Sequence, residues 1–426
     1  MRKLRSAVLF VLGAASLAAA HRQVIVITLD GYPAYALRDP KTPASAMRAL
    51  IQQGAWAPDG MTPVNPTVTW PNHTSMLTGV EPARHGVVYN GLAVRQDDAI
   101  HIDAGVPKAQ LILAPTVYDL ARKHGLKTAE VDWPATQDAS TIDFEFPEIP
   151  TSASPVVREM IQAGLIDAAG IDTFRKEPIA YRDEIWTQAA LHILRVHHPD
   201  LLLFHLLTTD SVQHVYGPRT LASSAALALA DRQVARLVDE VRSSGAASRT
   251  TILIVSDHGF ATAKRQIRPA ALLKERGIRN VIVVPEGGTA MLYGDVPAGV
   301  FEGVEGISRV IPPGEFAALG YPAPGPRMGN LVLAAAEGYA FSGSAEGPVV
   351  GPLPAGANPG NHGYLNSNPD MRPIFIAWGA GIESGARVEG IRTIDLAPTI
   401  ARLLGFEMTG SDGKPIAGLS RRPAAR

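Results

Sequence analysis

Three nearly continuous apolar runs, at residues 23–29, 200–207 and 251–255, constrain the fold of this chain more than any other feature. Each run lacks the alternation of polar and apolar residues that a half-exposed strand shows, so each is typical of a strand buried on both faces of a parallel sheet. Helical patterns at residues 183–196 and 221–243 lie between the runs. We therefore predict an α/β fold with a large, mostly parallel sheet flanked by helices on both faces.

Acidic residues follow the end of each run. Asp30 comes directly after the first run, Asp210 comes shortly after the second, and Asp257 comes shortly after the third. Ligands of open α/β sheets bind beyond the carboxyl ends of the strands, so we expect these three carboxylates to converge on a site. An Asp followed by Gly, as at Asp30, is also a common turn. The convergence of three strands, and not any single residue, therefore indicates the site.

A hydroxyl group is predicted to stand at the start of a short helix. Pro71 suits the first turn of a helix and Gly79 suits its end, which predicts a two-turn helix over residues 71–78. Thr69 would then lie just before the helix, where unpaired N–H groups and the positive end of the dipole favour an alkoxide and phosphoryl oxygens. The alternative is that Thr69 is an ordinary helix cap.

Five segments give the chain a resemblance to a known family: LDG (29–31), TWPNH (69–73), DSVQH (210–214), SDHG (256–259) and NHG (361–363). Together they resemble the nucleotide pyrophosphatase/phosphodiesterases of the alkaline phosphatase superfamily. The chain departs from that pattern at Trp70, where relatives usually carry Phe, and at Ala135, where they typically carry Gly. The resemblance implies an alkaline phosphatase-like fold, with residues 21–426 as one catalytic domain and insertions at about 136–182 and 261–361 on the active-site side.

The resemblance also implies a site with two zinc ions. The implied ligands are Asp210, His214 and His362 for one ion, and Asp30, Thr69, Asp257 and His258 for the other. Oxygen and nitrogen ligands of these types suit zinc in a site without sulfur, and the chain has no cysteine. The alternative for any one of these residues is a solvated turn or a buried side chain with ordinary hydrogen bonds.

The implied chemistry is cleavage of phosphoric diesters. Thr69 would attack phosphorus and form a phosphothreonine ester, while Asn90 and the backbone N–H of Trp70 would contact the non-bridging oxygens. Asn90 precedes a glycine, which is otherwise a turn signal. The organic part of the small-molecule substrate would be a nucleotide or a choline-type lipid head group. The aromatic residues that would form its wall, or else pack in the core, are Tyr32, Tyr35, Trp70 and Trp133.

Other functions explain the sequence less well. Sulfatases need a Cys or Ser that is modified to formylglycine, and Thr69 is neither. Phosphomonoesterases bring a positive side chain to the dianionic phosphate, and the residues around Thr69 are neutral, so diesters are favoured over monoesters. A phosphomonoesterase or a phosphonate hydrolase of the same superfamily is the alternative. A phosphoglycerate mutase-like protein would use Ser and an isomerase domain. A non-enzymatic secreted binding protein would leave the set of potential metal ligands unexplained.

The first twenty residues predict export. Basic residues precede an apolar run at residues 7–20, which ends in three alanines before His21, the pattern of a cleaved signal peptide. A membrane anchor needs about 20 apolar residues, so we expect a periplasmic or secreted protein without a transmembrane span in the mature chain. The formal net charge of −1 predicts no extended nucleic-acid surface.

Overall fold

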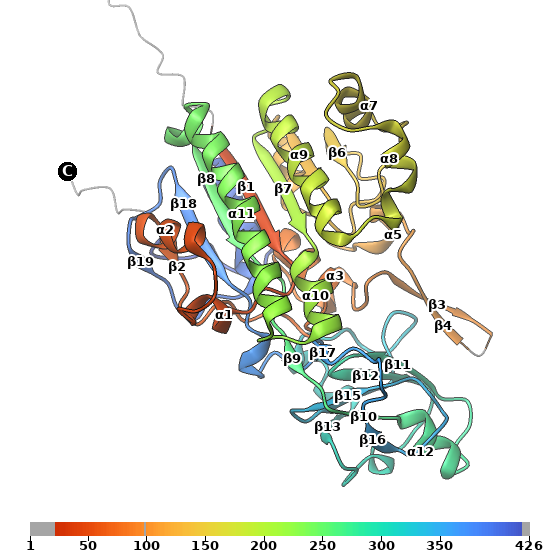
Figure 1. Ribbon diagram of the computed structural model, residues 1–426. Helices are drawn as coiled ribbons and strands as arrows, with labels where there is room; N and C mark the ends of the chain where they lie inside the picture. Colours follow the sequence, from red (N-terminus) through yellow and green to blue (C-terminus); the bar gives the residue numbers. More distant parts are fainter. Residues whose placement is uncertain (1–21, 98, 420–426) are drawn as a thin grey trace, which may run out of the picture.

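The computed structural model describes residues 22–97 and 99–419 (Figure 1). The predicted signal peptide at residues 1–20 lies outside the described residues. In the part of the chain that the structure describes, no helix combines the length and the apolar character needed to cross a membrane.

An eight-stranded mixed sheet forms the centre of the molecule, in the order β19-β2-β18-β8-β1-β7-β5-β6. Its strands are β1 (Gln23–Leu29), β2 (Ala55–Trp56), β5 (Thr128–Val131), β6 (Phe144–Phe146), β7 (Leu201–Leu206), β8 (Thr250–Val255), β18 (Phe375–Gly379) and β19 (Ala386–Arg387). β1 is parallel to β7 and β8, β5 is parallel to β6 and β7, and β18 is antiparallel to β8. The predicted large, mostly parallel sheet is confirmed.

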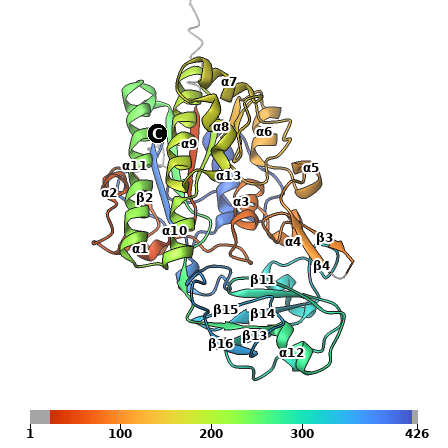
Figure 2. The same cartoon turned by 45° about the vertical axis from the view of Figure 1, so that its right-hand side comes forward.

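Helices cover both faces of this sheet, as predicted (Figures 1 and 2). Along β1, Ile25 and Ile27 pack into the core on one face, and Val24 and Val26 pack into the core on the other. The first face is covered by α2 (Ser45–Gln53), α9 (Ile179–Val196) and α11 (Leu221–Ser243), and the second by α3 (Thr69–Thr78), α6 (Val117–Lys123) and α13 (Leu396–Leu404). The apolar runs are continuous because successive side chains enter two different cores.

The helix that carries Thr69 begins earlier than predicted. α3 starts at Thr69 itself, with the extended residue Val68 before it, and ends at Gly79, whose φ of 69° is left-handed. Pro71 is thus the third helical residue. It is tolerated there because the first N–H groups of a helix have no partner within the helix. Thr69 lies in the first turn of the helix and does not precede it.

Residues 261–361 form a smaller body with its own sheets, which lies beyond one end of the main sheet (Figures 1 and 2). An antiparallel sheet of order β11-β12-β14-β13 packs with a three-stranded sheet of order β15-β10-β16 around a second hydrophobic core. The strands are β9 (Ala261–Thr262), β10 (Arg265–Ile267), β11 (Ile282–Glu286), β12 (Thr289–Tyr293), β13 (Ile307–Ile311), β14 (Leu331–Ala335), β15 (Tyr339–Phe341), β16 (Val350–Pro352) and β17 (Gly360–Asn361), with helix α12 (Pro269–Glu275). β17 pairs with β9 where this body joins the rest of the chain.

Residues 136–182 are more regular than their prolines suggested. They contain β6, which pairs with β5 at the edge of the main sheet, followed by α7 (Pro155–Gln162) and α8 (Ala168–Thr173). Pro155 stands in the first turn of α7, where its missing N–H costs nothing. The remaining elements are α1 (Ala34–Arg38), α4 (Pro82–His85), α5 (Lys108–Leu111), α10 (Thr208–Tyr216) and the hairpin β3 (Leu92–Gln96) and β4 (Ala99–Asp103).

Candidate active site

Three strand ends deliver the predicted acidic residues to one edge of the main sheet. Asp30 directly follows β1, Asp257 lies just beyond β8, and Asp210 lies in the first turn of α10, which follows β7. His362 arrives from the opposite direction, directly after β17 of the smaller body. The predicted ligands are therefore gathered where the main sheet meets that body.

Asp210, His214 and His362 form one group of potential ligands, with one ligand atom from each within 4.8 Å of the others. Asp210 Oδ1 lies 3.4 Å from His214 Nε2 and 3.8 Å from His362 Nε2. Asp210 and His214 share one face of α10, because residues four apart on a helix lie on the same side. The structure thus brings together all three residues that were assigned to one ion.

Asp30, Asp257 and His258 form the second group. His258 Nε2 lies 3.2 Å from Asp257 Oδ2 and 3.5 Å from Asp30 Oδ1. The chain must turn after β8 so that neighbouring residues face the same point. Glycine is required at position 259, because a Cβ atom there would lie 2.0 Å from the carbonyl oxygen of Asp370.

Unpartnered atoms in these groups fit a cation. Among the described residues, Asp30 Oδ1, Asp210 Oδ1, Asp257 Oδ2 and His258 Nε2 are buried without a hydrogen-bond partner. Buried carboxylate oxygens without donors are costly unless something positive faces them. Ligand atoms bound at 2.0–2.1 Å around a tetrahedral zinc are about 3.3 Å apart, which is close to the separations observed in both groups.

The histidine tautomers fit a cation as well. The Nδ1 atoms of His214, His258 and His362 lie 3.0, 3.1 and 3.1 Å from the carbonyl oxygens of Gly360, Gly259 and Thr67. A carbonyl oxygen only accepts, so each Nδ1 carries a proton, and each Nε2 is the ring nitrogen that faces the ligand group. This is the arrangement in which imidazoles bind metals. Donor types, spacing and tautomers therefore all suit two metal ions.

Charge makes the empty arrangement unfavourable. Burial, together with the charges of Asp257 and Asp210, raises the pKa of the Asp30 carboxyl well above its ordinary value. Burial and the neighbouring rings of His258 and His214 lower the pKa of His362, which therefore stays neutral. A cation would relieve the repulsion between the carboxylates, and it would leave the neutral imidazole available as a ligand.

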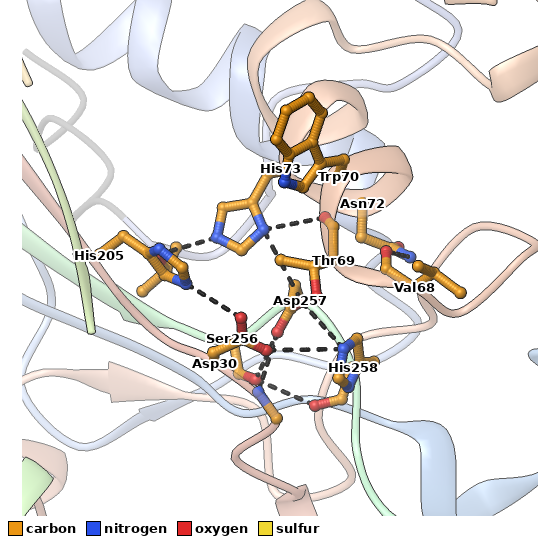
Figure 3. A network of polar contacts seen from close by, with 12 residues as sticks. Asp30, Val68, Thr69, Trp70, Asn72, His73, His205, Ser256, Asp257 and His258 are labelled. Atoms are coloured by element: carbon orange, nitrogen blue, oxygen red, sulfur yellow. Dashed lines mark hydrogen bonds and ion pairs between the residues drawn. The ribbon is translucent and has the colours of Figure 1, made fainter. Parts of the chain in front are cut away.

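Thr69 stands over the second group of ligands. It is buried at the start of α3, and Figure 3 shows its side chain on the side of the helix where Asp257 and His258 lie. His73, one turn further along, donates from Nδ1 to the Thr69 carbonyl oxygen at 2.9 Å. Burial and the neighbouring His205 lower the pKa of His73 to about 3, so this ring is neutral. His73 thus fixes the backbone that carries the hydroxyl.

Asn90 is held beside Thr69 by the next residue of α3. The backbone N–H of Trp70 donates to Asn90 Oδ1 at 2.9 Å. This hydrogen bond fixes the orientation of the Asn90 amide. Because Oδ1 accepts from the Trp70 N–H, Nδ2 points away from Trp70. The Trp70 N–H was expected to face the substrate directly; in the structure it orients Asn90.

Trp70 and Ala135, the two residues that differ from the family pattern, lie in the same hydrophobic cluster. Ala135 and Trp70 both pack with Val87, Leu111 and Ile112. Ala135 has a φ of 63°, in the left-handed region that favours glycine. The Ala135 methyl group that glycine lacks is buried in this cluster, which offsets part of the backbone strain. The loop thus retains a glycine-type conformation with an alanine.

Two of the four aromatic residues considered for a substrate wall are unavailable. Tyr32 and Trp133 are 0% and 3% exposed and belong to the cores on the two faces of the sheet. Tyr35 is partly buried beneath Arg219, whose guanidinium carbon lies 3.8 Å from the ring centroid. Trp70 therefore remains the candidate contact for the organic part of a substrate.

Sequence reasoning missed a buried relay behind Asp30. His205 Nε2 lies 3.1 Å from Asp30 Oδ2, and His205 Nδ1 lies 2.9 Å from the Asp132 carbonyl oxygen and 3.2 Å from Asp132 Oδ2. Burial alone would lower the pKa of His205, but Asp132 and Asp30 raise it well above its ordinary value. His205 is therefore protonated and holds Asp30 in place. The position of His205 within an apolar strand was the one signal available.

Sequence reasoning also missed Asp183, which caps α10 from a distant helix. Its carboxylate on α9 accepts hydrogen bonds from the backbone N–H groups of Leu207 at 3.0 Å and Thr208 at 3.1 Å. It fixes the first turn of the helix that carries Asp210 and His214. No local capping pattern could have shown this, because the partners are 24 and 25 residues apart.

We expect Asp183→Asn to lower the free energy of unfolding by about 1–3 kcal/mol and to weaken metal binding, because an amide nitrogen replaces one buried acceptor. Asp231 is a matched control, since it caps α2 in the same way through the N–H groups of Ala46 and Met47. Asp231→Asn should lose similar stability but keep metal affinity. Urea denaturation and zinc titration of both variants measure this. Equal zinc affinity in both would contradict a role for Asp183 in shaping the site.

The fold and the two acid–histidine groups beside a helix-borne hydroxyl define an alkaline phosphatase-like α/β enzyme. The model of the type I phosphodiesterase/nucleotide pyrophosphatase family matches residues 24–365, and the chain belongs to this family. It is accordingly a phosphoric diester hydrolase, as the sequence motifs predicted.

Similar proteins cover most of the chain. Ectonucleotide pyrophosphatase/phosphodiesterase family member 7 of Rattus norvegicus is 22% identical over 412 residues, which span 92% of this chain and 85% of the relative. Family member 1 of Homo sapiens is 24% identical over 290 residues, which span 67% of this chain and 28% of that protein. An inactive variant of murine family member 5, solved in complex with AMP, matches the fold with a TM-score of 0.72 at 17% identity, covering 92% of this chain and 97% of that one.

Proposed function

We propose that this protein is an exported, two-zinc phosphodiesterase or nucleotide pyrophosphatase that acts through a phosphothreonine intermediate. The observation that carries the proposal is the placement of Thr69, at the N-terminus of α3, beside two groups of carboxylate and imidazole ligands. The residues that would hold the ions are Asp210, His214 and His362 for one, and Asp30, Thr69, Asp257 and His258 for the other. Zinc bound there would lower the pKa of the Thr69 hydroxyl and stabilise charge on the departing oxygen.

The chain's own residues account for the remaining steps. Thr69 Oγ loses its proton to solvent and attacks phosphorus, and a new P–O bond forms as the bond to the leaving group breaks, with its electron pair going to the departing oxygen. Water then cleaves the phosphothreonine ester, which releases the second product and restores the hydroxyl. Asn90 Nδ2 would contact a non-bridging oxygen of the substrate. The Trp70 N–H keeps the Asn90 amide in the orientation that this requires.

A nucleotide is the substrate class with the most support, because a murine relative of the same fold was solved with AMP. A choline-type lipid head group is the second candidate, and the partly buried Trp70 could contact either. We place the protein in the periplasm or outside the cell on the basis of residues 1–20. We take residues 21–426 as one catalytic domain, with residues 136–182 and 261–361 as insertions in it.

We expect diesters to be hydrolysed about ten- to a hundredfold faster than monoesters, in terms of kcat/KM. A monoester brings a second charge and a third non-bridging oxygen, and the donors beside Thr69 are neutral. Asn72 cannot help, since its amide is buried and hydrogen-bonded to the carbonyl oxygens of Pro66 and Val68. The measurement compares p-nitrophenyl thymidine monophosphate and bis-p-nitrophenyl phosphate with p-nitrophenyl phosphate at one pH and one zinc concentration. Equal or faster monoester hydrolysis would assign the protein to the phosphomonoesterases.

A further inference from the structure

A third group of potential metal ligands lies outside the active site. Glu159 on α7, His192 on α9 and His197 directly after α9 each place one ligand atom within 4.8 Å of the others. Glu159 Oε2 lies 2.6 Å from His197 Nε2 and 3.3 Å from His192 Nε2. Both imidazoles therefore direct the same nitrogen at one carboxylate oxygen.

The surroundings of this group hold the two rings in place. His197 is stacked on Phe144 of β6, with ring centroids 4.0 Å apart and planes inclined by 20°. The His192 and His197 rings are inclined by 78° to each other, so their nitrogens approach the carboxylate from different directions. The imidazole side chains are 9% and 13% exposed, whereas the Glu159 side chain is 38% exposed. The nitrogens are thus fixed, and the carboxylate can move and remains open to solvent.

The distances suit a small divalent ion. Around a tetrahedral zinc, ligand atoms are about 3.3 Å apart, which the pair of Glu159 and His192 already matches. The Glu159–His197 pair must open by less than about 1 Å, which the exposed carboxylate allows by a small change of rotamer. Two imidazoles and one carboxylate are a common zinc donor set, with water at the remaining position.

The group is far from the candidate active site. α9 begins beside the active site, where Asp183 caps α10, and ends at Val196. His192 and His197 lie nine and fourteen positions beyond Asp183, which at 1.5 Å per residue corresponds to about 14 and about 21 Å along the helix. Figures 1 and 2 show α7 against the far part of α9. An ion at this position would therefore take no part in the chemistry at Thr69.

We propose that Glu159, His192 and His197 bind a third zinc ion, which clamps α7 of the segment 136–182 to the end of α9. In the absence of metal, the carboxylate and the imidazoles hydrogen-bond to one another and keep the ligands together. Binding replaces these hydrogen bonds with three coordination bonds between elements that are otherwise joined by side-chain packing. The clamp holds the edge strand β6 as well, because Phe144 stacks on one of the ligands.

The test counts zinc bound to the full chain, by elemental mass spectrometry after equilibration with micromolar free zinc. Glu159→Gln and His197→Gln should each bind one zinc fewer per chain than the wild type. His124→Gln is the matched control, because His124 is also stacked on a phenylalanine ring, Phe406, at 4.7 Å. It should bind as much zinc as the wild type.

Diesterase activity separates the third ion from the catalytic ions. The kcat/KM of Glu159→Gln should stay within about twofold of the wild type, because its site lies about 14–21 Å along α9 from Asp183. Equal zinc counts in the wild type and both ligand variants would overturn the proposal and leave an ordinary Glu–His cluster. Loss of activity together with the zinc would also overturn it, because the missing ion would then be a catalytic one. The zinc count does not depend on which ester is cleaved. The test of the third zinc site therefore remains valid even if the proposed diesterase function is wrong.

Discussion

Thr69→Ala should lower kcat/KM for a phosphodiester by roughly a thousandfold or more, while the fold and the metal content remain close to those of the wild type. The hydroxyl is the attacking group, and the hydroxyls of Thr74 and Ser75 do not replace it, because these residues lie further along α3 and are buried. The backbone at Thr69 is held by the hydrogen bond from His73 to its carbonyl oxygen, which alanine keeps. The measurements are steady-state kinetics, circular dichroism and zinc content.

Thr69→Ser is the conservative control for this experiment. Serine keeps the oxygen but lacks the methyl group that restricts the side-chain rotamer, so it should retain part of the rate. Trapping the intermediate adds a direct readout: acid quenching with a labelled substrate should leave label on the wild type and none on Thr69→Ala. Wild-type turnover by Thr69→Ala would show that another group attacks phosphorus.

The ligand groups could be predicted because they stand at elements with strong sequence signals. Asp30 follows a strand of seven buried residues, and the carboxyl ends of parallel strands must meet at one edge. Asp210 and His214 are four residues apart, and a helix places such residues on one face. The structure brings the carboxylates and imidazoles of each group together. The sheet geometry and the helical spacing account for this convergence, whereas the division of the ligands between two ions was implied by the family resemblance.

The supporting residues could not be predicted, because their partners are distant in sequence. Asp183 caps a helix that begins 25 residues later, and His205 contacts Asp30 across 175 residues. Gly259 is required by the approach of the Asp370 carbonyl oxygen, more than a hundred residues further along the chain. The start of α3 was misplaced because Pro71 fits the third helical position as well as the first. Tertiary contacts, and not local propensity, decide these features.

Asp30→Asn should remove the zinc held with Asp257 and His258 and lower kcat/KM by about a thousandfold. The substitution removes a carboxylate oxygen that would bind the ion. An ion at this site would contribute several kcal/mol of charge stabilisation to the transition state, and the loss of that contribution corresponds to a thousandfold lower rate. The amide keeps the size of the side chain and can still accept the hydrogen bond from His205 Nε2. Bound zinc is counted by elemental mass spectrometry, and kcat/KM is measured with a diester. Asp132→Asn is the matched control, because it also alters a buried carboxylate beside His205 but removes no ligand, so it should keep the zinc.

The stability of the metal-free protein gives Asp30→Asn a second signature. Burial, Asp257 and Asp210 raise the folded-state pKa of Asp30 above its unfolded value, so an ionised Asp30 costs stability, and this cost grows as the pH rises through the range between the two pKa values. Asparagine carries no charge and avoids the cost. Metal-free Asp30→Asn should therefore be at least as stable at neutral pH as the metal-free wild type, although zinc stabilises the variant less. Urea denaturation with and without zinc measures both effects. A metal-free variant clearly less stable than the metal-free wild type would mean that Asp30 serves the fold rather than an ion, because its charge would then be balanced within the protein itself.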